Sequence, residues 1–180
     1  MFKNLILMAV AILFISGCGR AEKIARIEQK CANNEAVWCL KLGKTYARRD
    51  INKGVMYYQK ACDLGDKRGC YRLAVLLNSK SINSKKDNET IVKSLTKSCD
   101  LGTPKACFEL GEYYEDDPKM QSKANELFAK SCEQRFGLAC YKLADFYGEK
   151  NDAATQKSYL ELACKYRYKV ACEEVAEDKK

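Results

Sequence analysis

The chain has 180 residues, and 47% of them are aliphatic, aromatic or cysteine, so a buried core is feasible. It carries 32 basic and 24 acidic residues, and with 2 prolines and 10 glycines it is not a low-complexity chain. It has no histidine, which removes the commonest general base and excludes Ser-His-Asp and Cys-His catalysis within the chain.

Residues 1–17 predict a secretion signal, because Lys3 precedes the apolar run LILMAVAILFI. That run is too short for a confident membrane span, although an uncleaved anchor helix is the alternative interpretation. The following Ile-Ser-Gly-Cys resembles the lipobox of bacterial lipoproteins. The resemblance implies cleavage before Cys18, acylation of Cys18 and stable membrane anchoring by several acyl chains. Gly19 follows the cysteine instead of aspartate, which under the sorting rules of that family favours the outer membrane.

These features predict a lipid-anchored protein of the bacterial cell envelope, at the outer membrane and facing the periplasm or the surface. An exported basic protein is not expected to bind nucleic acid. We expect its positive charge to meet anionic lipid headgroups, glycans or an acidic partner.

Eleven cysteines occur, and Cys18 accounts for the odd one because its sulfur is expected to carry lipid. The other ten form five pairs, each with a spacing of eight: Cys31/Cys39, Cys62/Cys70, Cys99/Cys107, Cys132/Cys140 and Cys164/Cys172. Export places them in an oxidising compartment, where disulfides persist. We therefore predict five C-x7-C disulfides.

The spacing also constrains the backbone. Residues eight apart on one helix lie roughly 12 Å apart, whereas a disulfide needs Cα atoms within about 7 Å, so each bridged pair must enclose a chain reversal. Gly65 can end a helix in the left-handed conformation, and Thr103-Pro104 can begin the next one. Zinc ligands are usually two to four residues apart, and the chain has no C-x-x-C, so no metal, cofactor or thioredoxin-like role is expected.

The segments around these pairs repeat. The sequences LKLG, YRLA, FELG, YKLA and EEVA follow the second cysteines, and their last residue, Gly or Ala, would let a neighbouring helix approach closely. Apolar residues recur at helical spacing, which predicts about ten short helices, the last near residues 169–177. We expect Asp117-Pro118 to begin a further helix and residues 79–88 to form a polar loop.

The segments KACDLGDKRGCYRLAVLL, KSCDLGTPKACFELGEYYE and KSCEQRFGLACYKLADFYG resemble SEL-one-like repeats, which are related to tetratricopeptide repeats. The cysteine pairs are most similar to the Helicobacter-type cysteine-rich protein family. The resemblance implies an all-α solenoid of antiparallel helix pairs over 23–177, after a lipidated anchor and linker (18–22) and before a charged tail (178–180). CANNEAVWC and CKYRYKVAC depart from it because they lack the Leu-Gly turn.

The resemblance further implies an interaction scaffold whose concave groove binds a protein, a peptide or a peptidoglycan-related fragment. Candidate partner contacts are the polar residues on the helices that follow the second cysteines, although ordinary solvation explains them equally: Lys41, Lys44, Arg72, Glu109, Glu112, Lys142 and Asp145. Tyr71, Phe108 and Tyr141 each follow a second cysteine, and packing in the core is favoured over a stacking ladder for a ligand.

The alternative function is weak β-lactam binding or β-lactamase-type hydrolysis, which only the family resemblance implies. Ser94-Leu95-Thr96-Lys97 fits the S-x-x-K pattern of serine β-lactamases, but neither K-T-G nor S-D-N accompanies it. A chance match on a solvated helix face explains it better, so no catalytic residue is predicted.

Overall fold

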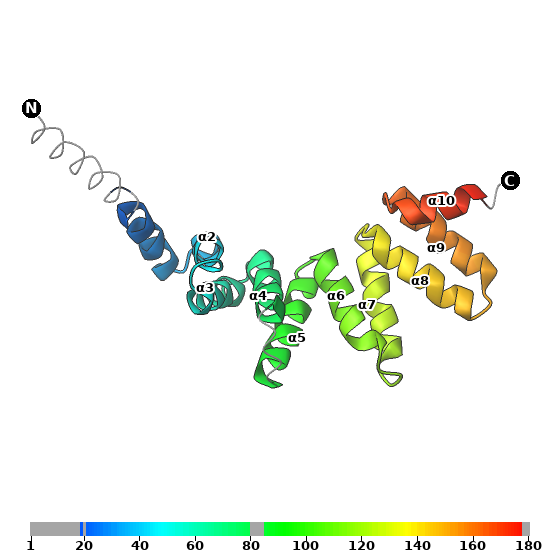
Figure 1. Ribbon diagram of the computed structural model, residues 1–180, viewed down its shortest axis with the longest axis horizontal. Coiled ribbons are helices and arrows are strands. Elements are labelled where there is room, and N and C mark those ends of the chain that lie inside the picture. The colour runs from blue at the N-terminus through cyan, green and yellow to red at the C-terminus, as the bar shows by residue number, and fades with distance from the viewer. Residues whose placement is uncertain (1–18, 20, 80–84, 178–180) are drawn as a thin grey trace, which may run out of the picture. The chain divides into compact units, whose positions relative to one another are not determined.

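The computed structural model describes residue 19, residues 21–79 and residues 85–177, and every regular element in these ranges is an α-helix. Residue 19 and residues 21–32 are helical and form the first helix. It is followed by α2 (Ala36–Tyr46), α3 (Ile51–Asp63), α4 (Lys67–Ser79), α5 (Lys85–Asp100), α6 (Pro104–Glu115), α7 (Gln121–Glu133), α8 (Gly137–Glu149), α9 (Ala153–Lys165) and α10 (Lys169–Glu177) (Figure 1). The expectation of about ten short helices is confirmed. The predicted signal 1–17, Cys18 and the tail 178–180 lie outside the described residues.

The chain divides into two compact units, Met1–Gly69 and Cys70–Lys180, here called the N-terminal and C-terminal units. In the N-terminal unit, α2 packs against α3. In the C-terminal unit, α6 pairs with α7 and α8 with α9, and further contacts join α5 to α6, α7 to α8 and α9 to α10 (Figure 1). Because short turns connect the paired helices, each pair is antiparallel, as in a solenoid of helix pairs. None of the helices within the described ranges has the length and apolarity needed to cross a membrane.

All five C-x7-C segments contain the same left-handed turn. The third residue after each first cysteine has a positive φ: Asn34 at 64°, Gly65 at 87°, Gly102 at 79°, Arg135 at 66° and Arg167 at 67°. Its N–H donates to the carbonyl of that cysteine at 2.8–3.0 Å, and the next N–H donates to the carbonyl of the residue before the cysteine at 3.0–3.2 Å. This bond pair is the Schellman motif. The segments without Leu-Gly therefore form the same turn as those with it.

The disulfides close these turns, as predicted from the spacing. Four have Cα–Cα distances of 4.5–4.8 Å: Cys31–Cys39, Cys99–Cys107, Cys132–Cys140 and Cys164–Cys172. Cys62 and Cys70 are disulfide-bonded as well. The residue before each of the last four first cysteines is small and has no solvent exposure: Ala61, Ser98, Ser131 and Ala163. Each of these four disulfides is therefore preceded by a fully buried position with little side-chain volume.

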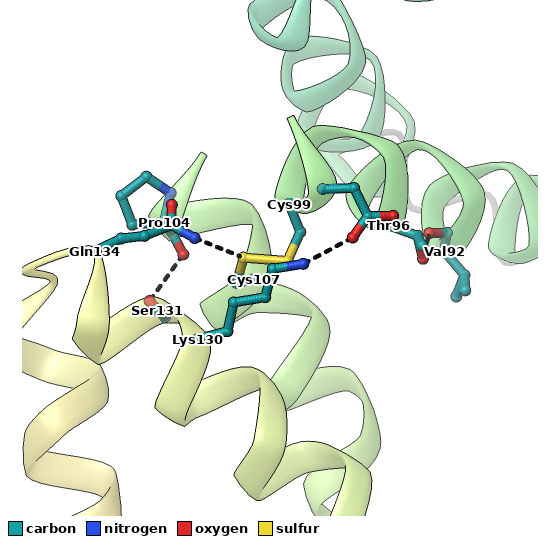
Figure 2. The surroundings of a disulfide bond; sticks show 9 residues. Val92, Thr96, Cys99, Pro104, Cys107, Lys130, Ser131 and Gln134 are labelled. Atoms are coloured by element: carbon teal, nitrogen blue, oxygen red, sulfur yellow. Dashed lines mark hydrogen bonds and ion pairs between the residues drawn. A yellow bond between two sulfur atoms is a disulfide. The ribbon is translucent and has the colours of Figure 1, made fainter. Parts of the chain in front are cut away.

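Figure 2 shows how neighbouring turns are joined around Cys99–Cys107. The Ser131 hydroxyl donates to the carbonyl of Pro104 at 2.8 Å, and the Gln134 amide approaches the Cys107 sulfur at 3.9 Å. Both donors come from the end of α7, one repeat later in the chain. The stapled turn between α5 and α6 is thus tied to the turn that follows it.

Two expected helix starts have different outcomes. Thr103 occupies the N-cap position of α6 and Pro104 its first position, as predicted, but the Thr103 hydroxyl makes no capping hydrogen bond. The Asp117-Pro118 prediction is wrong, because α7 begins only at Gln121. Asp117 instead closes a turn: its carboxylate accepts from the N–H of Lys119 at 2.9 Å and its carbonyl accepts from the N–H of Met120 at 2.8 Å. This local bonding competes with the helix that the same residues would otherwise cap.

Two boundaries also differ from expectation. Residues 85–88 are helical and belong to α5, so the predicted loop 79–88 is too long. The run is polar, but it contains neither Gly nor Pro, and polarity alone does not stop a helix. Residues 19, 21 and 22 are helical, so the predicted linker 18–22 overlaps the first helix.

Glycines four residues after a second cysteine permit close helix packing, as expected. A Cβ built on Gly111 would lie 2.6 Å from the ring of Phe128, and one built on Gly43 would collide with the ring of Tyr58. Phe128 and Tyr58 are 3% and 4% exposed. In both units an aromatic ring from the second helix of a pair therefore rests on the backbone of the first.

The shared turn predicts opposite effects of two substitutions. Gly102→Ala should lower the free energy of unfolding by about 1 kcal/mol, because a side chain is disfavoured at its positive φ. Arg135→Gly, at the same position of the next turn, should raise it by up to about 1 kcal/mol by relieving that cost. Urea denaturation followed by circular dichroism measures both changes, and shifts of the same sign would contradict the shared geometry.

Candidate functional site

A groove lies within the C-terminal unit, between α4, α5 and α6. Its volume is about 610 Å³, and it is lined by Tyr71, Ala74, Val75, Asn78, Ser79, Asn88, Ile91, Leu95, Lys105, Glu109, Glu112 and Tyr113. The aliphatic residues come mainly from α4 and α5. The charged residues all come from α6, so the groove has an apolar side and an ionic side.

A hydrogen bond links α4 to α6 in the groove. The Tyr71 hydroxyl donates to the Glu109 carboxylate at 2.6 Å, and the Lys105 ammonium lies 3.8 Å from the same carboxylate and 5.7 Å from the Tyr71 ring centroid. Burial, reinforced by the bond to Glu109, raises the pKa of Tyr71, so the phenol stays protonated and remains a donor. This contact fixes one helix of the groove against another.

The same contact occurs two repeats later, between α8 and α10. The Tyr141 hydroxyl donates to the Glu174 carboxylate at 2.7 Å, and its ring contacts the Tyr168 ring at a centroid distance of 5.0 Å. The hydrogen bond to Glu174, together with burial, raises the pKa of Tyr141. Each tyrosine directly follows a second cysteine, and each glutamate is the second residue after the second cysteine of the next repeat. The same two positions relative to the second cysteines therefore form both hydrogen bonds.

The aromatic residues after the second cysteines divide between two environments. Phe108 is 4% exposed and contacts the rings of Phe128 and Phe136 at 5.6 and 5.2 Å, which confirms the core prediction for this residue. Tyr71 and Tyr141 are half-buried and hold the glutamates described above. Tyr71 also lines the groove, so it serves both packing and the surface of the site.

The predicted partner residues are spread over both units. Lys41 and Lys44 are exposed on α2 of the N-terminal unit, and Lys41 lies 4.8 Å from the Trp38 ring centroid. Arg72 is exposed on α4 and does not line the groove. Glu109 and Glu112 do line it.

The other two predicted residues are on α8. Lys142 forms a half-buried ion pair with Glu115 of α6 at 2.9 Å. Desolvation and the charge of Glu174 raise the pKa of Asp145. Lys142 thus links α8 to α6, and its ammonium group is already paired with Glu115.

Several groove residues were missed in the sequence. The groove face of α4 follows Tyr71 at helical spacing, through Val75 and Asn78, that is, one, five and eight residues after Cys70. The candidate partner residues stand two and five residues after a second cysteine, so on α4 they included Arg72, which does not line the groove, and left out positions one and eight. The tyrosine that recurs directly after a second cysteine was the signal that could have identified the groove face of α4.

The S-x-x-K segment does not lie on a solvated face. Ser94 is 3% exposed within α5, which corrects that expectation. Burial withholds its hydroxyl from a substrate in solution. The described residues contain no group of three or more Cys, Asp or Glu side chains arranged to hold a metal ion.

The Sel1 repeat family model matches residues 32–66, 104–136 and 137–165, together more than half of the chain. The matches follow the helix pairs α2–α3, α6–α7 and α8–α9. No curated protein sequence matches the chain.

Solved structures share the fold. A Sel1 repeat protein from Oxalobacter formigenes is 17% identical with a TM-score of 0.69, over 85% of this chain and 67% of its own. The antigen c5321 of uropathogenic Escherichia coli is 22% identical with a TM-score of 0.70, over 84% of this chain but only 35% of its own. Helicobacter pylori cysteine rich protein B is 25% identical with a TM-score of 0.52, over 69% of this chain and 94% of its own.

The repeated helix pairs, their stapled turns and these matches lead to one conclusion: the chain belongs to the Sel1 repeat family, and its structural neighbours include a cysteine-rich Helicobacter member.

Proposed function

We propose that this Sel1-repeat scaffold is an exported, lipid-anchored protein of the bacterial envelope that binds an extended segment of a partner protein, or a peptidoglycan-related peptide, in the groove between α4, α5 and α6. The observation that carries the proposal is the groove itself. Its volume of about 610 Å³ is within the range of specific ligand sites.

The lining suits a peptide. Asn78 and Asn88 carry amides that both donate and accept, as a peptide backbone requires. Val75, 38% exposed, and the neighbouring Ile91 and Leu95 supply an apolar surface for side chains. These two features together favour a peptide whose backbone bonds to the amides and whose apolar side chains pack on the aliphatic residues.

The ionic side of the groove supplies selectivity. Glu109 is held by Tyr71 and Lys105, whereas Glu112 is exposed on the next turn of α6. Partial removal of the Glu112 carboxyl from water raises its pKa, and the charge of Lys142 opposes that shift. A cationic group on the ligand would stabilise the ionised Glu112, so we expect ligands with a basic residue to bind more tightly.

Anchoring rests on the sequence. The apolar run, the lipobox-like Ile-Ser-Gly-Cys and the ten disulfide-bonded cysteines all agree with export. Residue 19 is already helical, so an acylated Cys18 would hold the first helix close to the membrane surface.

We predict that a photo-crosslinking amino acid at Asn78 captures a discrete partner in the envelope of living cells. The same amino acid at Lys93, which is exposed on α5 but does not line the groove, is the matched control. Val75→Arg should reduce the Asn78 adduct about tenfold, the effect of ~1.4 kcal/mol of lost binding. An adduct of equal yield at Lys93, or one indifferent to Val75→Arg, would refute the groove. Digestion by a muramidase or a protease distinguishes cell-wall from protein partners.

We also predict that Cys18→Ala prevents acylation and releases the protein from membranes or blocks its maturation. The Cys18 sulfur is the expected attachment point, so its removal leaves no site for the lipid. Metabolic labelling with palmitate, followed by membrane fractionation, measures the effect. Label that persists in the Cys18→Ala variant would show that the assignment is wrong. Val75→Arg should lose the groove adduct but keep the label, which separates anchoring from binding.

A further inference from the structure

A second recess lies in the C-terminal unit, at the turns that connect α7 to α8 and α9 to α10. Its volume is about 420 Å³, and it is lined by Arg135, Lys165, Tyr166 and Arg167. It shares no residue with the groove between α4, α5 and α6. Its lining consists of three cationic side chains and one aromatic ring.

A glycine allows the two turns to pack closely. A Cβ built on Gly137, at the start of α8, would lie 3.0 Å from the carbonyl oxygens of Ala163 and Tyr166. Those carbonyls belong to the end of α9 and the turn after it. The turn that carries Arg135 is therefore packed on the turn that carries Arg167, which brings the residues that line the recess together.

Both arginines occupy the left-handed position that all five stapled turns share. Arg135 and Arg167 have φ values of 66° and 67°, in the left-handed region that a side chain disfavours. Gly65 and Gly102 occupy the equivalent positions of two earlier turns. In these two turns the position carries an arginine, and both arginines line one recess.

The cationic side chains of the recess have no acidic partner among the described residues. In the part of the chain that the structure describes, no ion pair involves Arg135, Lys165 or Arg167. The neighbouring Lys169, by contrast, pairs with Glu173 at 3.2 Å. All three cations are exposed, so they are open to a dissolved anion.

We propose that this recess binds a phosphorylated sugar, either free or as the headgroup of a lipid. The two guanidinium groups can each hold phosphate oxygens through paired N–H donors, and Lys165 adds a third positive charge. The half-buried ring of Tyr166 offers an apolar face beside them, on which a sugar ring can stack. A phosphate group and a sugar ring in one ligand would use both parts of the lining.

The test is calorimetric titration of the full-length chain, in neutral detergent, with glucose 6-phosphate. The double variant Arg135→Gly/Arg167→Gly should bind at least about tenfold more weakly. It keeps its fold because glycine is the residue at these positions in other turns. Lys93→Ala/Lys119→Ala removes two exposed charges elsewhere in the same unit and should bind as the unaltered protein does.

Two further ligands sharpen the result. Glucose should not bind, and inorganic phosphate should bind more weakly than glucose 6-phosphate, because each lacks one of the two recognised parts. Equal affinity of the Arg double variant, or equal binding of glucose, would overturn the proposal. Competition then identifies the source, with each lipid solubilised in the same detergent. Displacement by lipid A but not by phosphatidylcholine assigns a lipid headgroup, displacement by neither assigns a soluble sugar phosphate, and displacement by both would overturn the proposal.

Discussion

The rest of this structure depends on the stapled turn between the end of one helix and the start of the next. In each turn a left-handed residue closes two Schellman bonds, and a disulfide bridges the helices that it joins. The geometry of this turn fixes the direction in which the following helix leaves. Because the turn is nearly identical in all five repeats, equivalent residues of successive repeats recur in equivalent places. The two bonds Tyr71–Glu109 and Tyr141–Glu174 are a consequence.

The staple also compensates for a small core. Helices of 9 to 16 residues are marginal alone and must bury their apolar faces against neighbours. On the chain-entropy model, closing a nine-residue loop contributes about 2.5 kcal/mol by restricting the unfolded chain. Helix packing supplies the shape, through contacts such as Phe128 on Gly111, and the disulfides make that shape persist.

The sequence predicted what is local and repeated, and failed where a residue's role depends on rotation about a helix axis. The disulfides, the turn at Gly65 and the start of α6 follow from spacing and turn chemistry. Whether Ser94 is buried, or Tyr71 faces a groove, depends on how neighbouring helices rotate against each other. That rotation is set by packing across repeats. The strain at Arg135 was equally hidden, because a disfavoured conformation leaves no pattern of its own.

The central claim is that the staple stabilises a turn that helix packing already specifies. The most direct test is the unfolding of Cys99→Ala/Cys107→Ala in urea, compared with the unaltered chain under identical conditions. We expect the free energy of unfolding to fall by about 2–3 kcal/mol while the circular dichroism spectrum of the folded protein stays helical. Unchanged stability would show that the bridge contributes nothing. Loss of the helical spectrum without denaturant would show that the disulfide creates the turn instead of stabilising it.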